Sequence, residues 1–270
     1  MYRGYKVVVV VPAGRKRYLE LQLPYILQNM DIIDEYRYWV NTIIKEDIEY
    51  MECNSKTYSG FITMDVEDIK IVTNLNIHKF FKRTTDDGTI YLRMDDDVVW
   101  MEKGSIKTLL DFRIDHPEYF LVYGNTINNT ICDNIHQRLG VYNHINKIID
   151  YDCTGNGWDD PALAIVKHRT FFENIRNNDI QRYKFNLWRL YSYERVSINC
   201  ISWFGSEFAL FGGSVGEDEE KWLACDKPRD LEKCNCICGS ALFSHFAYCV
   251  QREEVDKTDI LKKYSSLISL

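Results

Sequence analysis

The sequence predicts an α/β fold in which a mixed, mostly parallel central β-sheet is flanked by helices. Short runs of β-branched and aromatic residues alternate with segments of helical periodicity, which is the pattern of βα units. Two of these runs end in charged loops, and open sheets of this kind bind ligands outside the carboxyl ends of their strands. Hydrophobic residues make up 46% of the 270 residues, which is sufficient for a packed core.

The first predicted element is a buried strand over 7–11, because five valines follow one another there and β-branched residues favour strands. Pro12 and Gly14 mark its end. A helix is predicted over 18–27, where apolar residues recur near helical spacing, although Pro24 lies inside it.

The remaining elements follow the same alternation. The segment 125–160 is polar and irregular and predicts a long loop. The last 20 residues are charged with a helical pattern, which predicts a peripheral C-terminal helix over 251–270. No repeat or linker divides the chain, so we expect a single domain over 1–270. Further strands are predicted at 36–41, 69–72, 89–94 and 119–125, and a further helix at 105–113.

Composition excludes several classes of protein. The formal net charge of -7 argues against non-specific nucleic-acid binding. No apolar run approaches the roughly 20 residues that span a bilayer, and the valine run is too short for a signal peptide. Nine cysteines without an export signal predict mostly reduced thiols and a cytoplasmic location.

Three consecutive aspartates, Asp95, Asp96 and Asp97, follow the predicted strand 89–94 and are themselves followed by an apolar run. Neighbouring carboxylates repel one another, and burial of an unpaired carboxylate is strongly unfavourable. A divalent cation with oxygen ligands removes this difficulty, and it can also hold a diphosphate. The alternative is a solvated acidic turn. The apolar flanks favour the metal site.

Basic residues follow the first strand. Arg15, Lys16 and Arg17 come directly after Gly14, where guanidinium and backbone N–H groups can bind a diphosphate or nucleotide. The alternative is an exposed basic turn. Arg93 lies two residues before Asp95 and shares its face of the strand, either to contact a phosphate or as a simple ion pair. No GxGxxG or Walker A sequence is present.

The segment 208–223 combines glycines with acids. A strand-like run ends at Gly212 and Gly213, which let the backbone approach a ligand closely. Glu217 and Asp218 then open a helix, where negative charge is favoured, and a carboxylate there can act as a general base. The alternative is the ordinary first turn of a helix.

The same segment satisfies the GxSxG pattern of a serine hydrolase, with Ser214 as nucleophile, Asp226 or Asp230 as acid and His245 as base. This alternative leaves the aspartates unexplained, and only 56 residues follow Ser214 to supply the rest of such a fold. His245 is either a satisfied core residue or a further metal ligand. Cysteines at alternate positions, Cys234, Cys236 and Cys238, indicate structural thiols rather than a zinc site.

In this order, the residues resemble the metal-dependent nucleotide-sugar glycosyltransferases of the GT-A fold. The resemblance covers roughly residues 5 to 250 and is carried by the N-terminal βα half, the Asp-x-Asp motif at 95–97, the glycine loop at 211–213, the pair Glu217-Asp218 and His245.

The resemblance implies that Asp97, Asp95 and His245 hold Mn²⁺ or Mg²⁺, while Asp95 also approaches the ribose or donor sugar. The triple aspartate leaves the register open, so that Asp96 can replace either neighbour. Asp218 would be the catalytic base of an inverting reaction, with Glu217 as the alternative, and the metal would stabilise the departing nucleoside diphosphate.

The resemblance further implies a donor-binding half over 1–100 and an acceptor-binding and catalytic half over 101–250. The donor would be a UDP- or GDP-sugar and the acceptor a hydroxyl of a glycan. Trp158 and Trp203 are candidate platforms for stacking on a sugar. The acceptor site would include Trp158, Asp159 and Asp160, and the Asp159-Asp160 pair is an alternative location for the base. Predicted donor-binding residues are Pro12, Gly14, Arg15, Arg17, Arg93, Asp95, Asp96, Gly212 and Gly213. A sugar-phosphate nucleotidyltransferase and a non-catalytic carbohydrate-binding protein remain alternatives.

Overall fold

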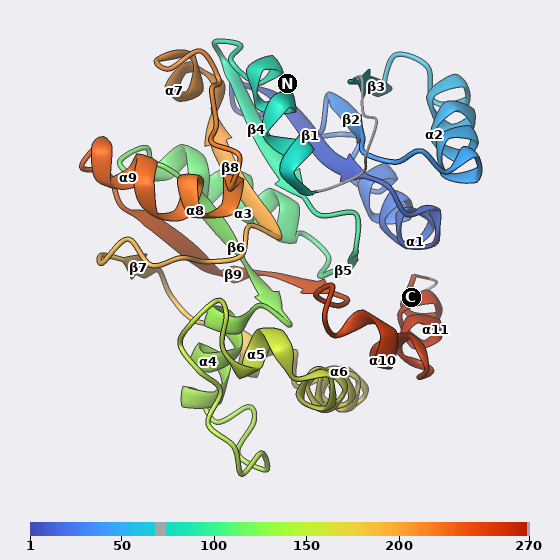
Figure 1. Cartoon of the computed structure of the whole chain (residues 1–270), viewed down its shortest axis with the longest axis vertical. Helices are drawn as coiled ribbons and strands as arrows, with labels where there is room; N and C mark the ends of the chain where they lie inside the picture. Colours follow the sequence, from blue (N-terminus) through green and yellow to red (C-terminus); the bar gives the residue numbers. More distant parts are fainter. Residues whose placement is uncertain (68–73, 269–270) are drawn as a thin grey trace.

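The computed structural model describes residues 1–67 and 74–268, and nine strands of these residues form one sheet (Figure 1). The strand order is β3-β2-β1-β4-β8-β6-β9-β5, and β7 pairs with β9. The strands are β1 (Lys6–Ala13), β2 (Glu35–Val40), β3 (Ile62–Val66), β4 (Thr89–Met94), β5 (Val98–Met101), β6 (Val122–Ile127), β7 (Trp188–Leu190), β8 (Cys200–Phe204) and β9 (Asn235–His245).

Most strands of this sheet run in one direction. β1 is parallel to β2 and β4, and β2 is parallel to β3. β8 is antiparallel to both β4 and β6, so β6 and its parallel neighbour β9 run the same way as β1. β5 and β7 are antiparallel to β9. The predicted α/β fold with a mixed, mostly parallel sheet is confirmed, and it brings the ends of β1, β2, β4, β6 and β9 to one edge.

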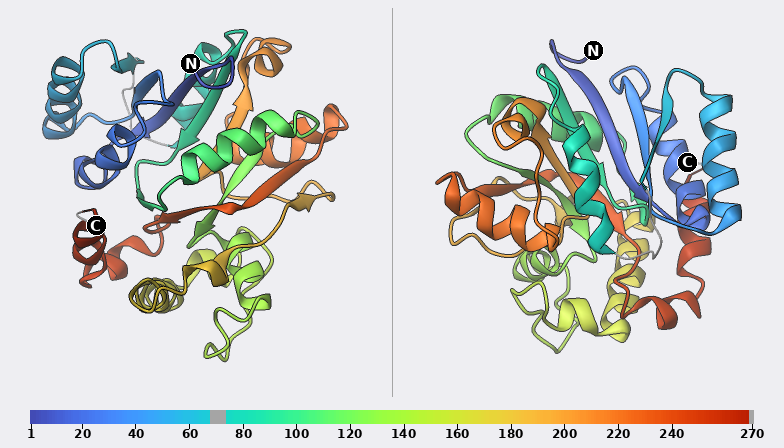
Figure 2. Two further views of the ribbon diagram at one scale, coloured as in Figure 1. Left: turned by 180° about the vertical axis from the view of Figure 1, so that it is seen from behind. Right: turned by 45° about the horizontal axis from the view of Figure 1, so that its top comes forward.

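Helices cover both faces of the sheet (Figure 2). They are α1 (Lys16–Leu27), α2 (Lys45–Thr57), α3 (Ser105–Asp115), α4 (Thr130–Arg138), α5 (Asn156–Asp159), α6 (Pro161–Arg176), α7 (Gly205–Ala209), α8 (Glu219–Lys221), α9 (Lys227–Asp230), α10 (Arg252–Asp256) and α11 (Ile260–Leu267). Two segments are 3₁₀ helices, η1 (Asn74–Arg83) and η2 (Ile180–Tyr183), and one is a π-helical segment, η3 (Trp222–Asp226).

The valine run of β1 is buried on both faces of the sheet. Val7, Val9 and Val11 belong to the core under α1, α3 and α6, while Val8 and Val10 belong to the core under η1, α4 and α7. Side chains alternate between faces along a strand, so an unbroken run of valines suits a strand with helices on both sides.

The strands predicted at 7–11, 36–41 and 89–94 and the helices at 18–27 and 105–113 are confirmed, within a few residues at their ends. Pro24 does not end α1. The strand predicted at 119–125 begins at Val122, and β3 was not predicted. The strand predicted at 69–72 lies outside the described residues. The C-terminal helix over 251–270 consists of two helices, α10 and α11.

Two predictions were wrong. The polar segment 125–160 contains α4, whose first turn is capped by the Asn129 side chain, and many of its polar side chains are buried and hydrogen-bonded to one another. The segment 208–211 is the end of α7 and a following turn, because Phe208 packs into the core from a helix. A serine-hydrolase elbow requires a strand before the nucleophile, so Ser214 does not occupy such an elbow.

Among the described residues, no helix combines the length and apolarity that a membrane crossing requires. Cys236 and Cys238 lie on β9 as buried free thiols, as expected for structural cysteines.

Candidate functional site

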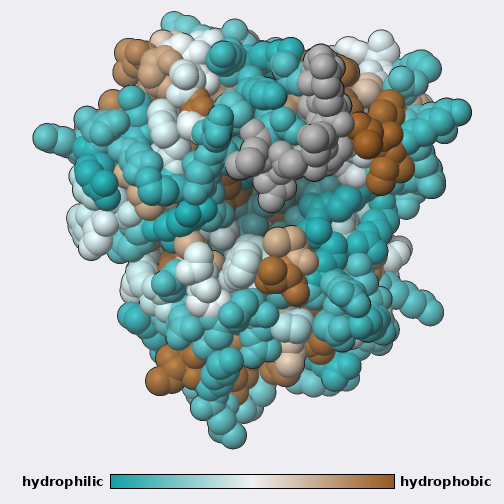
Figure 3. All heavy atoms as spheres, in the orientation of Figure 1, coloured by the Kyte–Doolittle hydropathy of each residue, from teal (hydrophilic) through white to brown (hydrophobic). Residues whose placement is uncertain are grey.

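A cleft of about 1050 Å³ opens at the edge where β1, β2, β4 and β9 end. The space-filling view shows this face hollowed near its centre (Figure 3). Each wall is made by a different loop, and the acidic residues after β4 form the floor. The lining residues are Pro12, Gly14, Arg15, Asn41, Thr42, Ile43, Ile44, Ile77, Arg93, Asp95, Asp96, Asp97, Trp158, Arg195, Ser197, Ile198, Asn199, Glu217, Asp218, Glu219, Glu220, His245, Ala247, Tyr248, Cys249 and Arg252.

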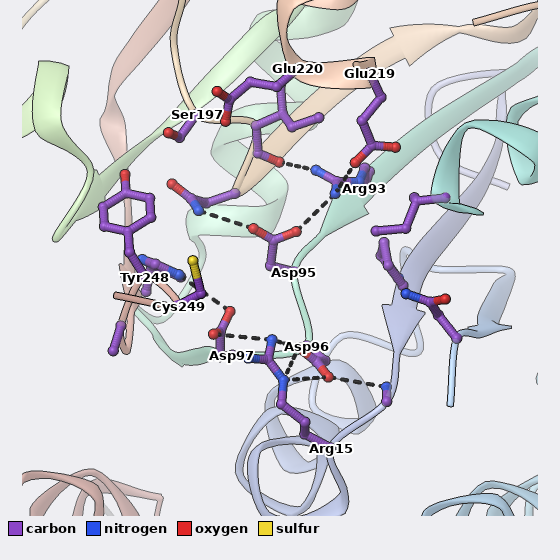
Figure 4. A pocket seen from close by; sticks show the side chains of 18 of the residues that line it. Arg15, Arg93, Asp95, Asp96, Asp97, Ser197, Glu219, Glu220, Tyr248 and Cys249 are labelled. Carbon is purple, nitrogen blue, oxygen red and sulfur yellow. Dashed lines mark hydrogen bonds and ion pairs between the residues drawn. The ribbon is translucent and has the colours of Figure 1, made fainter. Parts of the chain in front are cut away.

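Asp96 turns toward the loop after β1 and is buried (Figure 4). Its Oδ2 accepts a hydrogen bond from Gly14 N at 3.1 Å, and Arg15 Nε lies 3.0 Å from its Oδ1. Arg15 Nη2 also donates to Asp96. These contacts join the end of β1 to the end of β4. They use both oxygens of Asp96, so this carboxylate anchors the loop that carries Arg15.

Asp97 is buried beside two guanidinium groups and one imidazole. Its Oδ2 lies 3.1 Å from Arg15 Nη2 and 3.3 Å from Arg252 Nη2, and its Oδ1 lies 3.4 Å from His245 Nε2. Burial alone would raise the pKa of Asp97, but Arg15 and His245 outweigh it and hold the pKa well below its usual value. Asp97 is therefore ionised at neutral pH.

Asp95 faces the cleft and is the most exposed of the three, with 23% of its side chain accessible. Its Oδ1 lies 3.0 Å from Arg93 Nη2, and its Oδ2 accepts a hydrogen bond from Asn199 Nδ2 at 3.0 Å. The predicted proximity of Arg93 and Asp95 is confirmed. Figure 4 shows Arg93 between Asp95 and Glu219, so one guanidinium holds two carboxylates.

Asp95, Asp97 and His245 each offer a ligand atom, and these atoms lie within 4.8 Å of one another. Two carboxylate oxygens and one imidazole nitrogen form a donor set that suits Mn²⁺, and the oxygens suit Mg²⁺. His245 Nδ1 contacts the Asn128 carbonyl oxygen at 3.1 Å, which leaves Nε2 on the side of Asp97. The residues present therefore fit a divalent metal, and the third aspartate, Asp96, is not part of the group.

The facing wall of the cleft carries four consecutive carboxylates. Asp218 is half-exposed, caps α8 and lies 2.9 Å from Arg195, which also contacts Glu220 at 2.9 Å. Glu219 is buried, with its Oε1 3.0 Å from Arg93 Nη2. Burial raises the pKa of Glu219 to about 8, against the opposing effect of Arg93. Glu219 Oε2 has no hydrogen-bond partner among the described residues.

The structure brings most of the predicted site residues to this cleft. Residues from the loop after β1, the aspartate block, the acidic wall and the end of β9 all line it. They are Pro12, Gly14, Arg15, Arg93, Asp95, Asp96, Asp97, Trp158, Glu217, Asp218 and His245.

Other predicted site residues lie outside the lining. Arg17 pairs with Asp256 at 2.7 Å on the surface of α1. Gly213 packs against the backbone of Phe81 and Lys82 near the end of η1. Gly212 precedes it in the same turn. Both glycines lie on the segment between α7 and the acidic wall, and neither is among the residues that line the cleft.

The predicted acceptor residues divide in the same way. Trp158 lines the cleft, but Asp160 caps α6 and pairs with Lys147 at 3.0 Å. Asp159 is outside the lining as well. Trp203 is fully buried and stacks on Tyr91 and Phe208, so it is a core residue and not a platform for a sugar.

Three stretches of the lining were not predicted. They follow β2, precede β8 and follow β9, so the end of a strand lies beside each of them: 41–44, 197–199, and 247–249 with Arg252. The signal at β2 was present, since Asn41 directly follows a predicted strand. For the other two, β8 and β9 were not among the predicted strands, so the prediction placed no strand end beside them.

No protein-family model matches the chain, and no curated protein matches it in sequence. Among solved structures, glucosyl-3-phosphoglycerate synthase from Mycobacterium tuberculosis, in complex with Mn²⁺, uridine diphosphate and phosphoglyceric acid, matches with a TM-score of 0.51 and 11% identity. This match covers 98% of the chain and 78% of that structure.

CMP:2-keto-3-deoxy-manno-octonic acid synthetase complexed with CTP matches with a TM-score of 0.50 and 8% identity, over 97% of this chain and 99% of that one. At such low identity the two matches show the fold alone. The chain has a GT-A-like fold of the Rossmann-like type, as the sequence predicted.

Proposed function

We propose that this protein is a metal-dependent glycosyltransferase that moves a sugar from a nucleotide-sugar donor to a hydroxyl of a glycan acceptor. The observation that carries the proposal is the convergence of Asp95, Asp97 and His245 on the floor of a large cleft. Two of these residues follow β4, and the third is the last residue of β9. A donor set of this kind binds the metal that a diphosphate leaving group requires.

We place the donor, a UDP- or GDP-sugar, against the wall formed by the loops after β1 and β2. Gly14 and Arg15 follow β1, and residues 41–44 follow β2. Arg15 is already held toward the floor by Asp96 and Asp97, so its guanidinium is in place to contact a phosphate. The mycobacterial synthase, which has also been solved with Mn²⁺ and UDP-glucose, supports this choice of donor through its fold.

The metal would be held by Asp95, Asp97 and His245, with Mn²⁺ or Mg²⁺ as the ion. When bound, it would offset the negative charge that develops on the diphosphate as the bond to the anomeric carbon breaks. Arg15 and Arg252 flank Asp97 and would offset part of the same charge.

The base would come from the acidic wall. In an inverting reaction, one carboxylate takes the proton of the acceptor hydroxyl while that oxygen attacks the anomeric carbon. We retain Asp218 for this role, with Glu217 as the alternative, and we add Glu219 because its Oε2 is unpartnered and its pKa is raised to about 8. Single variants Asp218→Asn, Glu217→Gln and Glu219→Gln tell them apart, since loss of the base lowers kcat and leaves donor affinity unchanged.

The charges of the cleft support an uncharged hydroxyl acceptor such as a glycan. Seven carboxylates and four guanidinium groups line it, and each guanidinium already pairs with a carboxylate. An anionic acceptor would meet a net negative wall next to a negative diphosphate. Trp158 and Tyr248, with ring centroids 6.5 Å apart, offer aromatic surface to a sugar ring instead.

A sugar-phosphate nucleotidyltransferase is the second candidate, because the CTP-bound synthetase shares the fold over nearly the whole of both chains. The two activities differ in their products. A nucleotidyltransferase releases pyrophosphate from a nucleoside triphosphate, whereas a glycosyltransferase releases a nucleoside diphosphate from a nucleotide sugar.

All nine cysteines are free thiols in the structure, and we propose a cytoplasmic location for this activity. Glycan biosynthesis is the process in which such a transferase would act.

A thermal-shift screen of nucleotides and nucleotide sugars, with and without Mn²⁺, tests the proposal. We expect a nucleoside diphosphate or its sugar to raise the Tm only when Mn²⁺ is present. Asp97→Asn should abolish this shift, because it removes an anionic metal ligand and leaves Arg15 and Arg252 to repel the cation.

Asp111→Asn is the matched control, since Asp111 lies on α3 away from the cleft and pairs with Arg3 and Lys107. It should keep the Mn²⁺-dependent shift. If no nucleotide shifts the wild-type Tm in Mn²⁺, and Asp97→Asn behaves like the wild type, the proposed function is wrong.

A further inference from the structure

A second set of polar residues lies behind the cleft and is buried. It comprises Asn128 at the end of β6, Asp133 on α4, Lys167 on α6 and Gln251 just before α10, all with 0% exposure. Burial of so many polar groups is unfavourable unless each is paired. None of them lines the cleft, so neither the metal group nor the acidic wall accounts for them.

Asn128 is the centre of this set. Its carbonyl oxygen contacts His245 Nδ1 at 3.1 Å. Its side-chain Nδ2 donates to the Phe246 carbonyl at 3.1 Å and to Gln251 Oε1 at 3.1 Å. One residue therefore holds His245, the residue after it, and the residue before Arg252.

The backbone of Asn128 is itself fixed. Its φ is +60°, a left-handed conformation that asparagine tolerates better than most residues. Its N–H donates to Asp133 Oδ1 at 3.2 Å, and Lys167 Nζ lies 2.7 Å from Asp133 Oδ2. This buried ion pair anchors the turn, since moving Asn128 would leave a buried charge with fewer partners.

The same set reaches the wall of the cleft that carries Trp158. Lys167 Nζ and Gln251 Nε2 both donate to the Gly157 carbonyl, at 3.3 and 2.9 Å. The metal-ligand side and the aromatic side of the cleft are thus attached to one buried framework.

The contact to the carbonyl decides which nitrogen of His245 can bind a metal. A carbonyl oxygen only accepts hydrogen bonds, so Nδ1 keeps its proton and Nε2 is the nitrogen that faces Asp97. Partners of this kind fix the tautomer and orientation of metal-binding histidines.

We propose that Asn128 is a positioning residue for the metal site: its carbonyl orients His245, and its amide ties the chain that follows this ligand to the turn held by the Asp133–Lys167 pair. This inference rests on the proposed metal-dependent function, since it assigns a residue that prepares the same metal group.

The test is Mn²⁺ affinity, measured by electron paramagnetic resonance of free Mn²⁺ as protein is titrated with the metal alone. Asn128→Asp keeps the shape and the tolerance for positive φ but replaces the Nδ2 donor with an oxygen facing two acceptors. We expect the Kd for Mn²⁺ to rise about 10- to 100-fold.

Asn235→Asp is the matched control. Asn235 is equally buried at the other end of β9, where its Nδ2 donates to the Leu223 carbonyl at 3.1 Å and its Oδ1 accepts from Leu121 N at 3.0 Å. This variant should lower the Tm as well, because it also places a carboxylate oxygen against the carbonyl oxygen that the amide donated to. Its Kd for Mn²⁺ should equal that of the wild type.

Asn128→Gly provides a second variant in case Asn128→Asp does not fold, since glycine keeps the positive φ and the carbonyl and removes only the amide. It should weaken Mn²⁺ binding in the same direction.

Wild-type affinity in a folded Asn128 variant overturns the inference, and so does an equal loss in Asn235→Asp, which would mean a general effect of stability. Absence of Mn²⁺ binding by the wild type itself would instead contradict the proposed function.

Discussion

The loops at the two ends of the strands, which form two edges of the central sheet, differ in composition. At the edge where β1, β4 and β9 end, the loops carry buried or half-buried charges, including Asp96, Asp97 and Glu219. At the opposite edge, positive-φ glycines dominate the turns, among them Gly4 before β1, Gly60 before β3 and Gly88 before β4. The glycine edge satisfies the backbone locally, whereas the charged edge depends on partners from distant parts of the chain.

This difference indicates where the molecule is built for function. A glycine turn needs only backbone freedom and close packing. Burial of a carboxylate costs free energy of desolvation, so buried carboxylates are found where a cation or a substrate binds them. Arg93 illustrates the charged edge, because one buried guanidinium holds Asp95 and Glu219 from segments more than a hundred residues apart in sequence.

Lys167→Met should give the largest loss of stability at the charged edge. It leaves Asp133 buried without its 2.7 Å partner, and loss of one member of a buried ion pair costs about 3–5 kcal/mol. Urea unfolding measures the change. Lys147→Met, which removes an exposed partner of Asp160, should have little effect. An equal free energy of unfolding in both variants would mean that the buried pair contributes no more to stability than the exposed one.

Glu219→Gln should change the pH dependence of stability. The pKa of Glu219 is raised to about 8 in the folded state, whereas an unfolded glutamate titrates near pH 4.3. Between these values the folded state binds more protons, so the wild type loses stability as pH rises toward 8.

The glutamine variant should lack this loss, on the order of 2–4 kcal/mol, because it carries no charge to bury. Urea unfolding at pH 5 and pH 8.5 makes the comparison. Parallel pH profiles for the two proteins would contradict a raised pKa at this position.

Gly213→Ala tests a glycine turn, by comparison with the charged edge, and should have a smaller effect. Its φ is +64°, and an added Cβ would lie 2.5 Å from the Phe81 carbonyl oxygen. We expect a loss of about 1–3 kcal/mol, with the Mn²⁺-dependent nucleotide shift unchanged. Gly212 has a similar φ of +61°, but no atom lies within 4 Å of an added Cβ. The loss of stability in Gly212→Ala therefore measures the cost of the positive φ alone. A weakened nucleotide shift in Gly213→Ala would instead support the donor-binding role that the sequence predicted.

The sequence predicted the charged edge well because its signals are local. The valines of β1 and the three aspartates after β4 are contiguous, and a strand followed by charge places both at a sheet edge. His245 was predicted either as a core residue or as a further metal ligand, and the family resemblance favoured the ligand. Its position beside Asp97 depends on β9 ending at the same edge as β4.

Other features were not predictable from local patterns. The run at 208–211 has the composition of a strand but forms the end of α7, because its aromatic residues pack against Phe81 and Trp203. Glu219 and Glu217 are indistinguishable in the sequence. Only the facing Arg93, contributed by β4, makes Glu219 the buried one.

The sequence by itself determined the α/β class, the strand that delivers three aspartates, and the basic loop after β1, because each follows from side chains adjacent in the chain. The tertiary structure alone decided how the aspartates divide their roles. Asp96 turns to Gly14 and Arg15, while Asp95 and Asp97 turn to the cleft and His245. The physical reason is that a carboxylate's environment is set by the cations that meet it, and here every such cation except Arg93 comes from another segment of the chain.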